Sequence, residues 1–380
     1  MKICILVLNN FGTLGGVQIA TLNLAEQLIQ LGHEVHIVTF APNKKPFCNL
    51  DNNLYKVHII HPIIPIKNPY FSFLGIILYI FPSFKVVRKV GADIVHVQHF
   101  SPALSAYIIK KVLKIPYVIS VHGENNCYTE RGPIVSAVLK WIRPLLPEIQ
   151  NAAAIVSLTQ NTKKDIEKCF KKESIVIPNG VNLKLFTLNK DRPFLDPLVP
   201  RIICISRLNE QKGIEYALHA VKLLKKDFPR IKLIIIGDGE CRHSLEDQAI
   251  DLKLANNVIF LGEVPNEDLV KHLYDSNVFL LPSFREGFSL SLLEAMASGL
   301  PVVATPVGSN PLIKIWNNGY LVPIKDSGAI YHAIRGIISD PEKWEIFSRN
   351  SIKNAQKYSW EKVAKKYEEQ YYLILGKYQK

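Results

Sequence analysis

The chain has 380 residues, 48% of them hydrophobic, and a formal net charge of +13. This length is more than one hydrophobic core normally serves, so it predicts two domains. No apolar run is long enough to cross a bilayer, and the apolar start, Met1–Leu8, is too short for the core of a signal peptide. The six cysteines are scattered without the spacing of zinc ligands, so we expect reduced thiols in a cytoplasmic protein.

The positive charge is concentrated in the first half of the chain. Residues 1–185 hold 20 Lys and Arg against 10 Asp and Glu, whereas residues 186–380 hold 26 against 23. No helix-turn-helix, zinc-finger or aromatic-basic pattern accompanies the cations, so nucleic acid is not an expected partner. The charge distribution favours an anionic membrane surface or an anionic acceptor.

Short β-branched runs alternate with amphipathic stretches, which is the pattern of β-α units around parallel sheets, and the pattern occurs twice. In the first half the expected strands are Ile3–Leu8, Glu34–Thr39, Lys56–His61, Asp93–Gln98, Pro116–Val121, Ala154–Leu158 and Ser174–Pro178. In the second half they are Arg201–Ser206, Lys232–Gly237, Asn257–Gly262, Asn277–Pro282, Pro301–Thr305 and Gly319–Val322. The sequence therefore predicts an α/β protein with two doubly wound, Rossmann-like domains.

The two series of strands are separated by Phe186–Pro200, which has three prolines and no periodicity. This composition is typical of an interdomain linker. We expect an N-terminal domain over residues 1–185, a linker over 186–200 and a C-terminal domain over 201–357. The periodic stretch near the end, about 358–380, predicts a helix that could pack on either domain.

Ligands of doubly wound sheets bind beyond the carboxyl ends of the strands, where helix N-termini leave backbone N–H groups free. The first such turn contains Gly15 and Gly16, ahead of a predicted helix over Val17–Leu31. These glycines serve either a tight turn or the close approach of a phosphate or sugar. No acidic residue follows the second strand where dinucleotide folds bind a ribose, so a nicotinamide or flavin cofactor is disfavoured.

Two cations follow the first strand of the second series. Arg207 and Lys212 precede a predicted helix that begins at Ile214. A cation in the first turn of a helix opposes the helix dipole unless an anion lies between them. The pair therefore predicts either a bound diphosphate or two solvated surface cations.

Two carboxylates follow the strand Asn277–Pro282. Glu286 lies on the loop at the strand's exit, and Glu294 lies in an otherwise apolar helix. A buried carboxylate is costly unless hydrogen-bond donors meet it. Ribose hydroxyls are such donors, and backbone N–H groups are the alternative.

The stretch PSFREGFSLSLLEAMASGLPVVAT, residues 282–305, resembles the signature of the retaining glycosyltransferases of the GT-B fold, specifically family four. GGVQIATLNLAEQLIQLGHEVHIVT, VISVHGE, VIPNGVN, ISRLNEQKG and LIIIGDGE match in the same order. The resemblance spans Met1 to about Pro323. It implies a GT-B fold and the transfer of a sugar, with retention of anomeric configuration, from a nucleotide-diphosphate-sugar to a glycan, lipid-linked or small-molecule acceptor.

The resemblance also implies a role for each candidate residue. Arg207 and Lys212 would neutralise the departing diphosphate, Glu286 would face the donor sugar, and His122 would contact the sugar. Glu294 would bind the ribose. The remaining implied donor contacts are the backbone of Gly287, Phe288 and Ser289, the glycine pair Gly15 and Gly16 beside the diphosphate, and the turns at Gly237 and Val264 against the base.

No D-x-D carboxylate cluster stands in a metal-binding context, so fixed cations are expected to replace a divalent ion at the leaving group. We expect no metal and no cofactor besides the sugar nucleotide. The chain departs from the family where Asn310-Pro311-Leu312 follows Gly308-Ser309, which places an acidic contact from this loop in doubt. A conventional catalytic base is not identified.

Two other functions are compatible with this architecture. A nucleotide-sugar epimerase would need acid and base residues at the sugar carbon, and an inactive sugar-nucleotide-binding protein would need no turnover at all. The stretch Pro62–Lys85, followed by Arg88 and Lys89, mixes aromatic, aliphatic and cationic residues. It predicts either a segment that lies in a membrane interface or a loop and helix that cover the first sheet.

Overall fold

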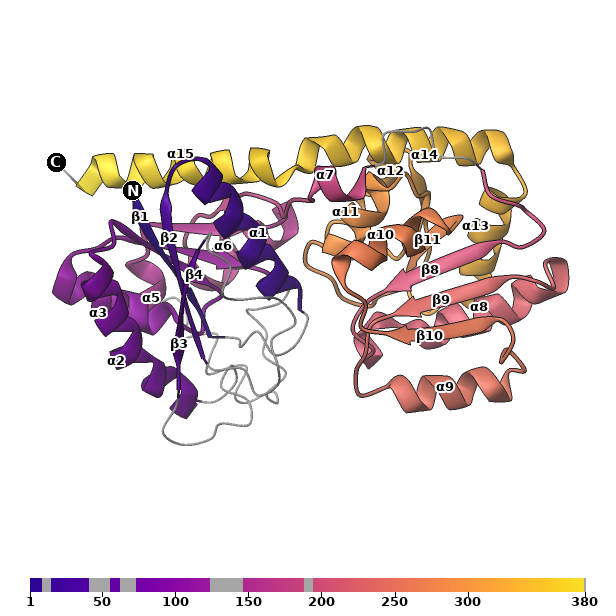
Figure 1. Cartoon of the computed structure of the whole chain (residues 1–380), viewed down its shortest axis with the longest axis horizontal. Helices are drawn as coiled ribbons and strands as arrows, with labels where there is room; N and C mark the ends of the chain where they lie inside the picture. The colour runs from indigo at the N-terminus through magenta and orange to yellow at the C-terminus, as the bar shows by residue number, and fades with distance from the viewer. Residues whose placement is uncertain (9–14, 41–54, 62–72, 124–145, 188–193, 379–380) are drawn as a thin grey trace. The chain divides into compact units, whose positions relative to one another are not determined.

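The computed structural model describes residues 1–8, 15–40, 55–61, 73–123, 146–187 and 194–378. The chain forms two compact units. Unit 1 contains Met1–Asn179 together with Trp360–Lys380, and unit 2 contains Gly180–Ser359. Each unit is built around its own parallel β-sheet (Figure 1).

The sheet of unit 1 has seven strands in the order β3-β2-β1-β4-β5-β6-β7, all parallel. The strand order reverses between β1 and β4, as it does in doubly wound folds. Strands β4 and β5 are buried along their whole length, because helices cover both faces of the sheet. The strands are β1 (Lys2–Val7), β2 (Glu34–Phe40), β3 (Lys56–Ile60), β4 (Ile94–Gln98), β5 (Tyr117–Val121), β6 (Ala154–Ser157) and β7 (Ile175–Val176).

The helices of unit 1 connect successive strands, and the last helix of the chain returns to the same unit. Helices α2 and α3 pack against each other, and α15 packs against α1 (Figure 1). The contacts therefore assign the C-terminal helix to unit 1, a choice that the sequence leaves open. The helices are α1 (Gly16–Gln30), α2 (Phe73–Val90), α3 (Ala103–Leu113), α5 (Pro147–Gln150), α6 (Gln160–Phe170) and α15 (Trp360–Tyr378).

The sheet of unit 2 has six parallel strands in the order β10-β9-β8-β11-β12-β13, with the reversal between β8 and β11. The strands are β8 (Arg201–Ile205), β9 (Lys232–Ile236), β10 (Val258–Gly262), β11 (Val278–Leu281), β12 (Val302–Ala304) and β13 (Gly319–Leu321). The helices are α7 (Leu183–Phe186), α8 (Ile214–Asp227), α9 (Arg242–Asp251), α10 (Asn266–Tyr274), α11 (Leu290–Ala297), α12 (Leu312–Trp316), α13 (Ser327–Ile338) and α14 (Pro341–Ala355), with 3-10 turns η2 (Glu210–Lys212) and η3 (Gln356–Tyr358).

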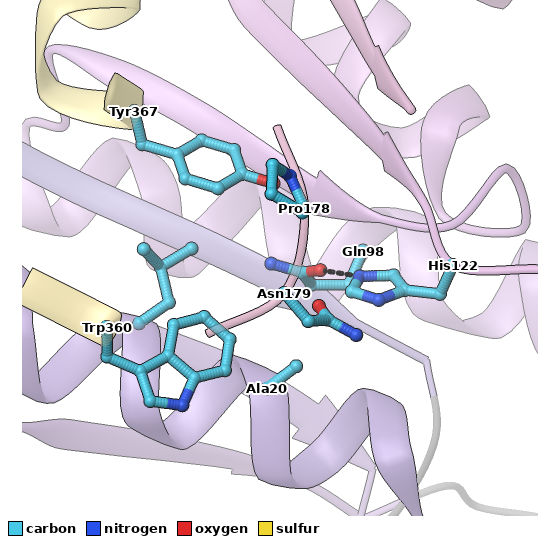
Figure 2. Close-up of a pocket in the computed structure, with 8 residues that line it drawn as sticks. Ala20, Gln98, His122, Pro178, Asn179, Trp360 and Tyr367 are labelled. Carbon is cyan, nitrogen blue, oxygen red and sulfur yellow. Dashed lines mark hydrogen bonds between the residues drawn. The ribbon is translucent and has the colours of Figure 1, made fainter. Parts of the chain in front are cut away.

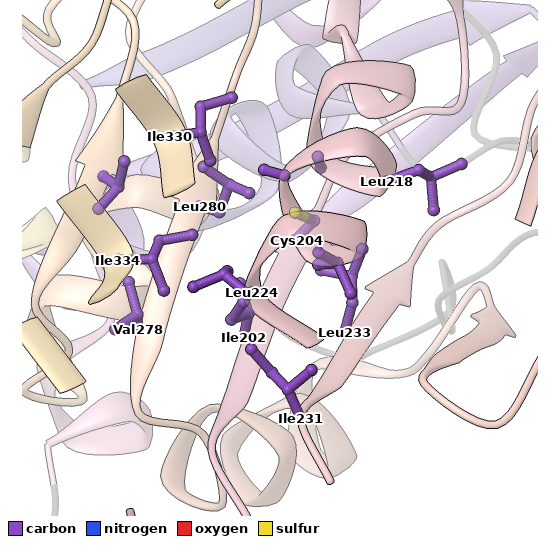
Figure 3. Close-up of a cluster of buried hydrophobic side chains, with 14 of the residues drawn as sticks. Ile202, Cys204, Leu218, Leu224, Ile231, Leu233, Val278, Leu280, Ile330 and Ile334 are labelled. Carbon is purple, nitrogen blue, oxygen red and sulfur yellow. The ribbon is translucent and has the colours of Figure 1, made fainter. Parts of the chain in front are cut away.

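One face of the second sheet carries a continuous apolar core under α8 and α13 (Figure 3). Alternate residues of β8, Ile202 and Cys204, point into this core, and Leu224 of α8 and Ile334 of α13 close it. Cys204 is fully buried there, as expected for a thiol that fills space in a strand. This core fixes the strand ends from which the candidate site is built.

The observed α/β architecture confirms the predicted fold class, and the predicted strands agree with the observed ones to within about two residues at each end, the usual uncertainty of such boundaries. The change of unit at Asn179 and Gly180 differs from the predicted boundary at residues 185 and 186. The reason is that α7 already packs on α10 and α11 of unit 2. Within the predicted linker, the ring of Phe194 lies edge-on to Trp344 of the same unit.

Candidate functional site

The predicted cations and carboxylates of unit 2 leave two neighbouring strands. Arg207 and Lys212 follow β8, and Glu286 follows β11. Strands β8 and β11 pair directly, and the strand order reverses between them. A sheet of this kind binds its ligands at such a reversal, so topology alone brings the three side chains to one edge of the sheet.

Lys212 and Glu286 form an ion pair between the two loops. The Nζ atom of Lys212 donates to Oε1 of Glu286 at 2.7 Å. The backbone N–H of Phe284 also donates to the carbonyl oxygen of Gln211 at 2.7 Å, which joins the same loops a second time. The glutamate side chain is 8% exposed, so the pair is largely shielded from solvent screening.

Two glycines hold the loop of Glu286 in place. Gly213 has φ +61° and lies so close to Pro282 that a Cβ atom would be 2.4 Å from the Pro282 carbonyl oxygen. Gly308 has φ +58°, and a Cβ atom there would be 2.3 Å from the carbonyl oxygen of Gly287. Both positions combine a left-handed backbone with contacts that admit no side chain. The loop is therefore rigidly placed before any ligand arrives.

Arg207 stands apart from this ion pair. Its side chain is exposed, and within the described part of the chain no ion pair or hydrogen bond involves its guanidinium. An arginine without a partner keeps its whole fork of donors for a carboxylate or phosphate. The edge of unit 2 thus carries one charge-paired lysine and one arginine that is available to an anion.

Glu294 lies on α11, which starts directly after the same loop. The helix begins at Ser289, whose Oγ accepts a hydrogen bond from the N–H of Leu292 at 3.2 Å, as an N-cap does. Burial raises the pKa of the Glu294 carboxyl to about 7. No hydrogen bond from a described residue reaches this carboxylate.

The other residues of the signature have identifiable roles in the loop. The ring of Phe288 is buried and lies 5.6 Å from that of Tyr358, centroid to centroid. The carbonyl of Gly287 accepts a hydrogen bond from the N–H of Ser309 at 3.1 Å. These contacts anchor the loop and leave the first N–H groups of α11 without partners inside the helix, as at every helix start.

The predicted base-binding residues lie at the ends of β9 and β10. Gly237 has φ +123°, and a Cβ atom there would be 2.0 Å from the carbonyl oxygen of Ser206. Its N–H donates to the carbonyl of Gly262 at 2.7 Å, and Val264 follows two residues later. The structure therefore brings Gly237 against the backbone that precedes Arg207, at the same edge of the sheet.

His122 directly follows β5 in unit 1 and lines a small pocket (Figure 2). Its Nε2 atom is hydrogen-bonded to Oε1 of Gln98. Burial, with a smaller contribution from His99, lowers the pKa of His122 to about 3, so the ring is neutral at physiological pH. With the Gln98 oxygen as acceptor, Nε2 carries the proton and Nδ1 carries a lone pair that can accept a hydrogen bond. The residues around the pocket are Ala20, Leu24, Gln98, His122, Pro178, Asn179, Trp360 and Tyr367.

His99 is a residue that sequence reasoning missed. It follows β4 and has φ +83°, a backbone conformation that is uncommon for a residue other than glycine. Its N–H donates to the carbonyl of Ser120 at 2.7 Å. Its electrostatic interaction with His122 contributes to the lowered pKa of that ring. Residues held in such conformations occur preferentially at functional sites. The only feature of the sequence that could have identified His99 is its position directly after a predicted strand.

Gly15 and Gly16 open α1 at the end of β1. Gly15 has φ −143° and is the residue before the helix, and Gly16 is its first residue. The preceding turn, which includes Gly12, lies outside the described residues. The pair therefore lies at the same edge of its sheet as His122, and its contact with a ligand stays a prediction.

Two family models match successive parts of the chain. Residues 14–185 match the family model described as Glycosyltransferase Family 4, and residues 189–357 match the model described as Glycosyl transferases group 1. An uncharacterized glycosyltransferase of Methanocaldococcus jannaschii is 29% identical over 92% of this chain and 92% of its own. Alpha-monoglucosyldiacylglycerol synthase of Acholeplasma laidlawii is 28% identical over 96% of this chain and 95% of its own.

Two solved structures share the fold. Sucrose-phosphate synthase from Thermosynechococcus elongatus superposes with a TM-score of 0.84 at 21% identity, over 99% of both chains. Anabaena HepE, in complex with UDP and glucose, superposes with a TM-score of 0.78 at 21% identity, over 97% of this chain and 98% of its own. At these identities the likeness extends to the fold.

Proposed function

Because the chain belongs to the glycosyltransferases of the GT-B fold, which transfer sugars from nucleotide donors, we propose that it moves a sugar from a nucleotide-diphosphate-sugar to a glycan or lipid-linked acceptor with retention of configuration. The observation that carries this proposal is the pairing of Lys212 with Glu286 at the reversal of the second sheet, the edge at which the exposed Arg207 also follows β8. Cations at this edge face the place where a departing diphosphate accumulates charge.

Arg207 and Lys212 bind the diphosphate, together with N–H groups at the start of α11 other than that of Leu292, which Ser289 caps. These groups are fixed by their loops, so they stabilise the leaving group without reorganisation. The carboxylate of Glu294 accepts hydrogen bonds from the ribose, which compensates for its burial. Gly237 and Val264 border the space for the base.

Within unit 2, the donor sugar is held by Glu286. Oε1 of Glu286 is already occupied by Lys212, and no described residue donates to Oε2, which can therefore accept from sugar hydroxyls. Within unit 1, the neutral ring of His122 offers Nδ1 as an acceptor for a ligand hydroxyl. A neutral histidine with a pKa near 3 orients a hydroxyl but is a weak proton acceptor, so neither residue is assigned as a conventional base.

The proposed chemistry needs no divalent ion. Arg207 and Lys212 supply the positive charge that a metal would otherwise place on the diphosphate. Within the described ranges, no group of three His, Cys, Asp or Glu side chains is arranged to hold a metal. The sugar nucleotide is a co-substrate, and no other cofactor enters the proposal.

The acceptor side of the proposal rests on unit 1. One relative is named for the synthesis of a glycolipid, alpha-monoglucosyldiacylglycerol. In this chain, helix α2 contains no acidic residue, and its described side chains expose two apolar residues followed by three cations. Ile77 is 45% exposed and Phe81 63% exposed, and the Nζ atom of Lys85 lies 4.4 Å from the centre of the Phe81 ring. Arg88 and Lys89 follow in the last turn, both exposed.

This exposed side of α2 fits an anionic bilayer, the inner face of a cytoplasmic membrane. Phe81 and Ile77 can enter the interface, while each nearby cation contributes about 1 kcal/mol at an anionic surface. None of the helices within the described residues is long and apolar enough to span a membrane. Residues 62–72 of the predicted membrane-contacting stretch lie outside the described residues.

Sedimentation with vesicles tests the membrane contact. Phe81→Ser and the double variant Lys85→Glu/Arg88→Glu should each reduce recovery with anionic vesicles at low salt. Ile250→Ser is the matched control, because Ile250 is 64% exposed on α9 of unit 2. Recovery that is the same with neutral and anionic vesicles, or unchanged in all variants, contradicts the contact without affecting the enzymatic assignment.

A donor screen tests the enzymatic proposal. The purified protein is incubated with labelled nucleotide sugars and an extract of membrane lipids and glycans, and label in the acceptor fraction is measured. We expect transfer from one class of nucleotide sugar, and slower transfer by the Arg207→Ala variant. A change of the sugar nucleotide itself without any acceptor would instead indicate an epimerase. Binding without any turnover would indicate a sugar-nucleotide-binding protein.

A further inference from the structure

The Glu286 carboxylate is bound by two donors at one oxygen. Oε1 accepts from Nζ of Lys212 at 2.7 Å and from Oγ of Ser283 at 2.7 Å. Ser283 is fully buried. Since both donors meet the same atom, the carboxylate has a fixed direction before a sugar nucleotide binds.

The serine is itself held firmly. It directly follows Pro282, against which Gly213 packs, and its carbonyl oxygen accepts a hydrogen bond from the Thr305 hydroxyl at the end of β12. Its hydroxyl therefore has little freedom to turn away from Glu286. Ser283 is in this sense a positioning residue, because it acts on Lys212 only through the carboxylate.

The ion pair changes what the lysine offers to a diphosphate. An ammonium that already touches a carboxylate attracts an incoming anion less than a free ammonium does, because the carboxylate repels that anion from nearly the same distance. Glu286 and Lys212 are both shielded from solvent, so this repulsion is only partly screened. Arg207 lacks such a partner among the described residues and keeps its full attraction.

We propose that Ser283 and Glu286 form with Lys212 a charge-balancing triad that weakens the binding of the free nucleoside diphosphate, so that the site favours the intact donor over the product. In the donor, the sugar hydroxyls donate to Oε2 of Glu286 and offset the repulsion. After transfer the sugar is gone, the repulsion remains, and the nucleoside diphosphate leaves. This inference rests on the proposed function, since it takes Lys212 to face the diphosphate.

Isothermal titration of the full chain with UDP, GDP and ADP tests the triad, using the nucleotide that binds. Glu286→Gln keeps an acceptor oxygen for Lys212 and Ser283 but removes the charge. We expect it to bind the nucleoside diphosphate about tenfold more tightly than the parent protein, a typical effect of removing one like charge at close range. The variant should at the same time lose most of its transfer activity.

Ser283→Ala provides a second test, because this substitution leaves the net charge of the protein unchanged. Without the serine the carboxylate is less fixed, so the gain from Glu286→Gln should be smaller in the Ser283→Ala background than in the parent protein. Glu267→Gln is the control, because it removes one exposed negative charge of unit 2 that belongs to neither of the two loops. It should leave the affinity unchanged.

The inference is overturned if Glu286→Gln binds the nucleoside diphosphate no more tightly than the parent protein while Lys212→Ala weakens it. Equal tightening by Glu267→Gln overturns it as well, because the effect would then come from total charge. If Lys212→Ala and Arg207→Ala both leave the affinity unchanged, the diphosphate site of the proposed function falls together with the inference. Non-additivity of Ser283→Ala and Glu286→Gln, together with the tighter binding, supports the triad.

Discussion

The hydroxyl of Tyr371 on the C-terminal helix is hydrogen-bonded to Nδ1 of His96 on β4 at 2.7 Å, with both side chains fully buried. The other nitrogen of His96 bonds to the hydroxyl of Ser120 at 2.7 Å, which in turn bonds to the hydroxyl of Tyr367 at 2.9 Å. Burial lowers the pKa of His96 to about 3, so the network is uncharged. A satisfied polar network inside a sheet-helix interface specifies one docking position for α15.

Tyr371→Phe should destabilise unit 1. The change keeps the ring and leaves one nitrogen of His96 without its partner, which costs about 1–3 kcal/mol. Chemical denaturation followed by tryptophan fluorescence measures the loss. Tyr372→Phe is the control, because the neighbouring side chain is 57% exposed. Equal midpoints for the two variants would show that the network contributes nothing to docking.

The network also shows where sequence reasoning succeeds and where it fails. Strands such as β9, with the residues KLIII, are visible in the sequence because buried parallel strands are continuously apolar. The packing of α15 is not visible, because the helix period gives its apolar side but not the sheet that receives it. His96 and Tyr371 are far apart in the chain, and nothing local to either residue indicates the other.

The candidate site, like the fold, could be predicted from the sequence only in part. The cation at the start of a helix predicted either a bound diphosphate or a solvated side chain for Lys212, whereas the structure pairs it with a carboxylate of the same chain, Glu286. That identity depends on the pairing of β8 with β11, which local sequence does not reveal. The role of Ser283 and the left-handed backbone of His99 likewise arise only from tertiary packing.

Glu294→Gln should stabilise the protein at neutral and alkaline pH while weakening donor binding. Burial raises the folded-state pKa of Glu294 from 4.5 to about 7. The folded state therefore prefers the protonated carboxyl, and stability is lost as the pH rises from 4.5 through 7. The glutamine variant avoids this loss, which amounts to about 3 kcal/mol above pH 7. Below pH 4.5 the advantage should vanish.

Melting temperatures of the parent protein and Glu294→Gln, recorded from pH 4.5 to 8.5, measure the effect. Tight binding of the sugar nucleotide should also weaken in the parent protein as the pH falls below about 7, because the protonated carboxyl is a poorer acceptor for the ribose. A difference in melting temperature that does not vary with pH would contradict the assignment of a raised pKa.

Arg207→Ala and Lys212→Ala should lower kcat by about ten- to a hundredfold each, the amount expected for one lost charge-assisted contact that is strongest in the transition state. Arg230→Ala, an exposed cation after α8, should transfer at the parental rate. Steady-state kinetics at saturating donor separates kcat from KM. Parental rates in both site variants would place the diphosphate elsewhere.

Full activity should survive an excess of a metal chelator, because Arg207 and Lys212 carry the charge on the leaving group. The measurement compares initial rates after dialysis against chelator with rates after addition of Mg²⁺ or Mn²⁺. A rate that falls in chelator and recovers with either ion would show that the diphosphate is neutralised by a metal.

The stereochemistry of the product tests the central claim most directly. Nuclear magnetic resonance of the product formed from an α-linked sugar nucleotide reports the configuration of the new bond through its anomeric coupling. Retaining transfer at the site of Lys212, Glu286 and Glu294 predicts an α-linked sugar on the acceptor. A β-linked product would contradict the account.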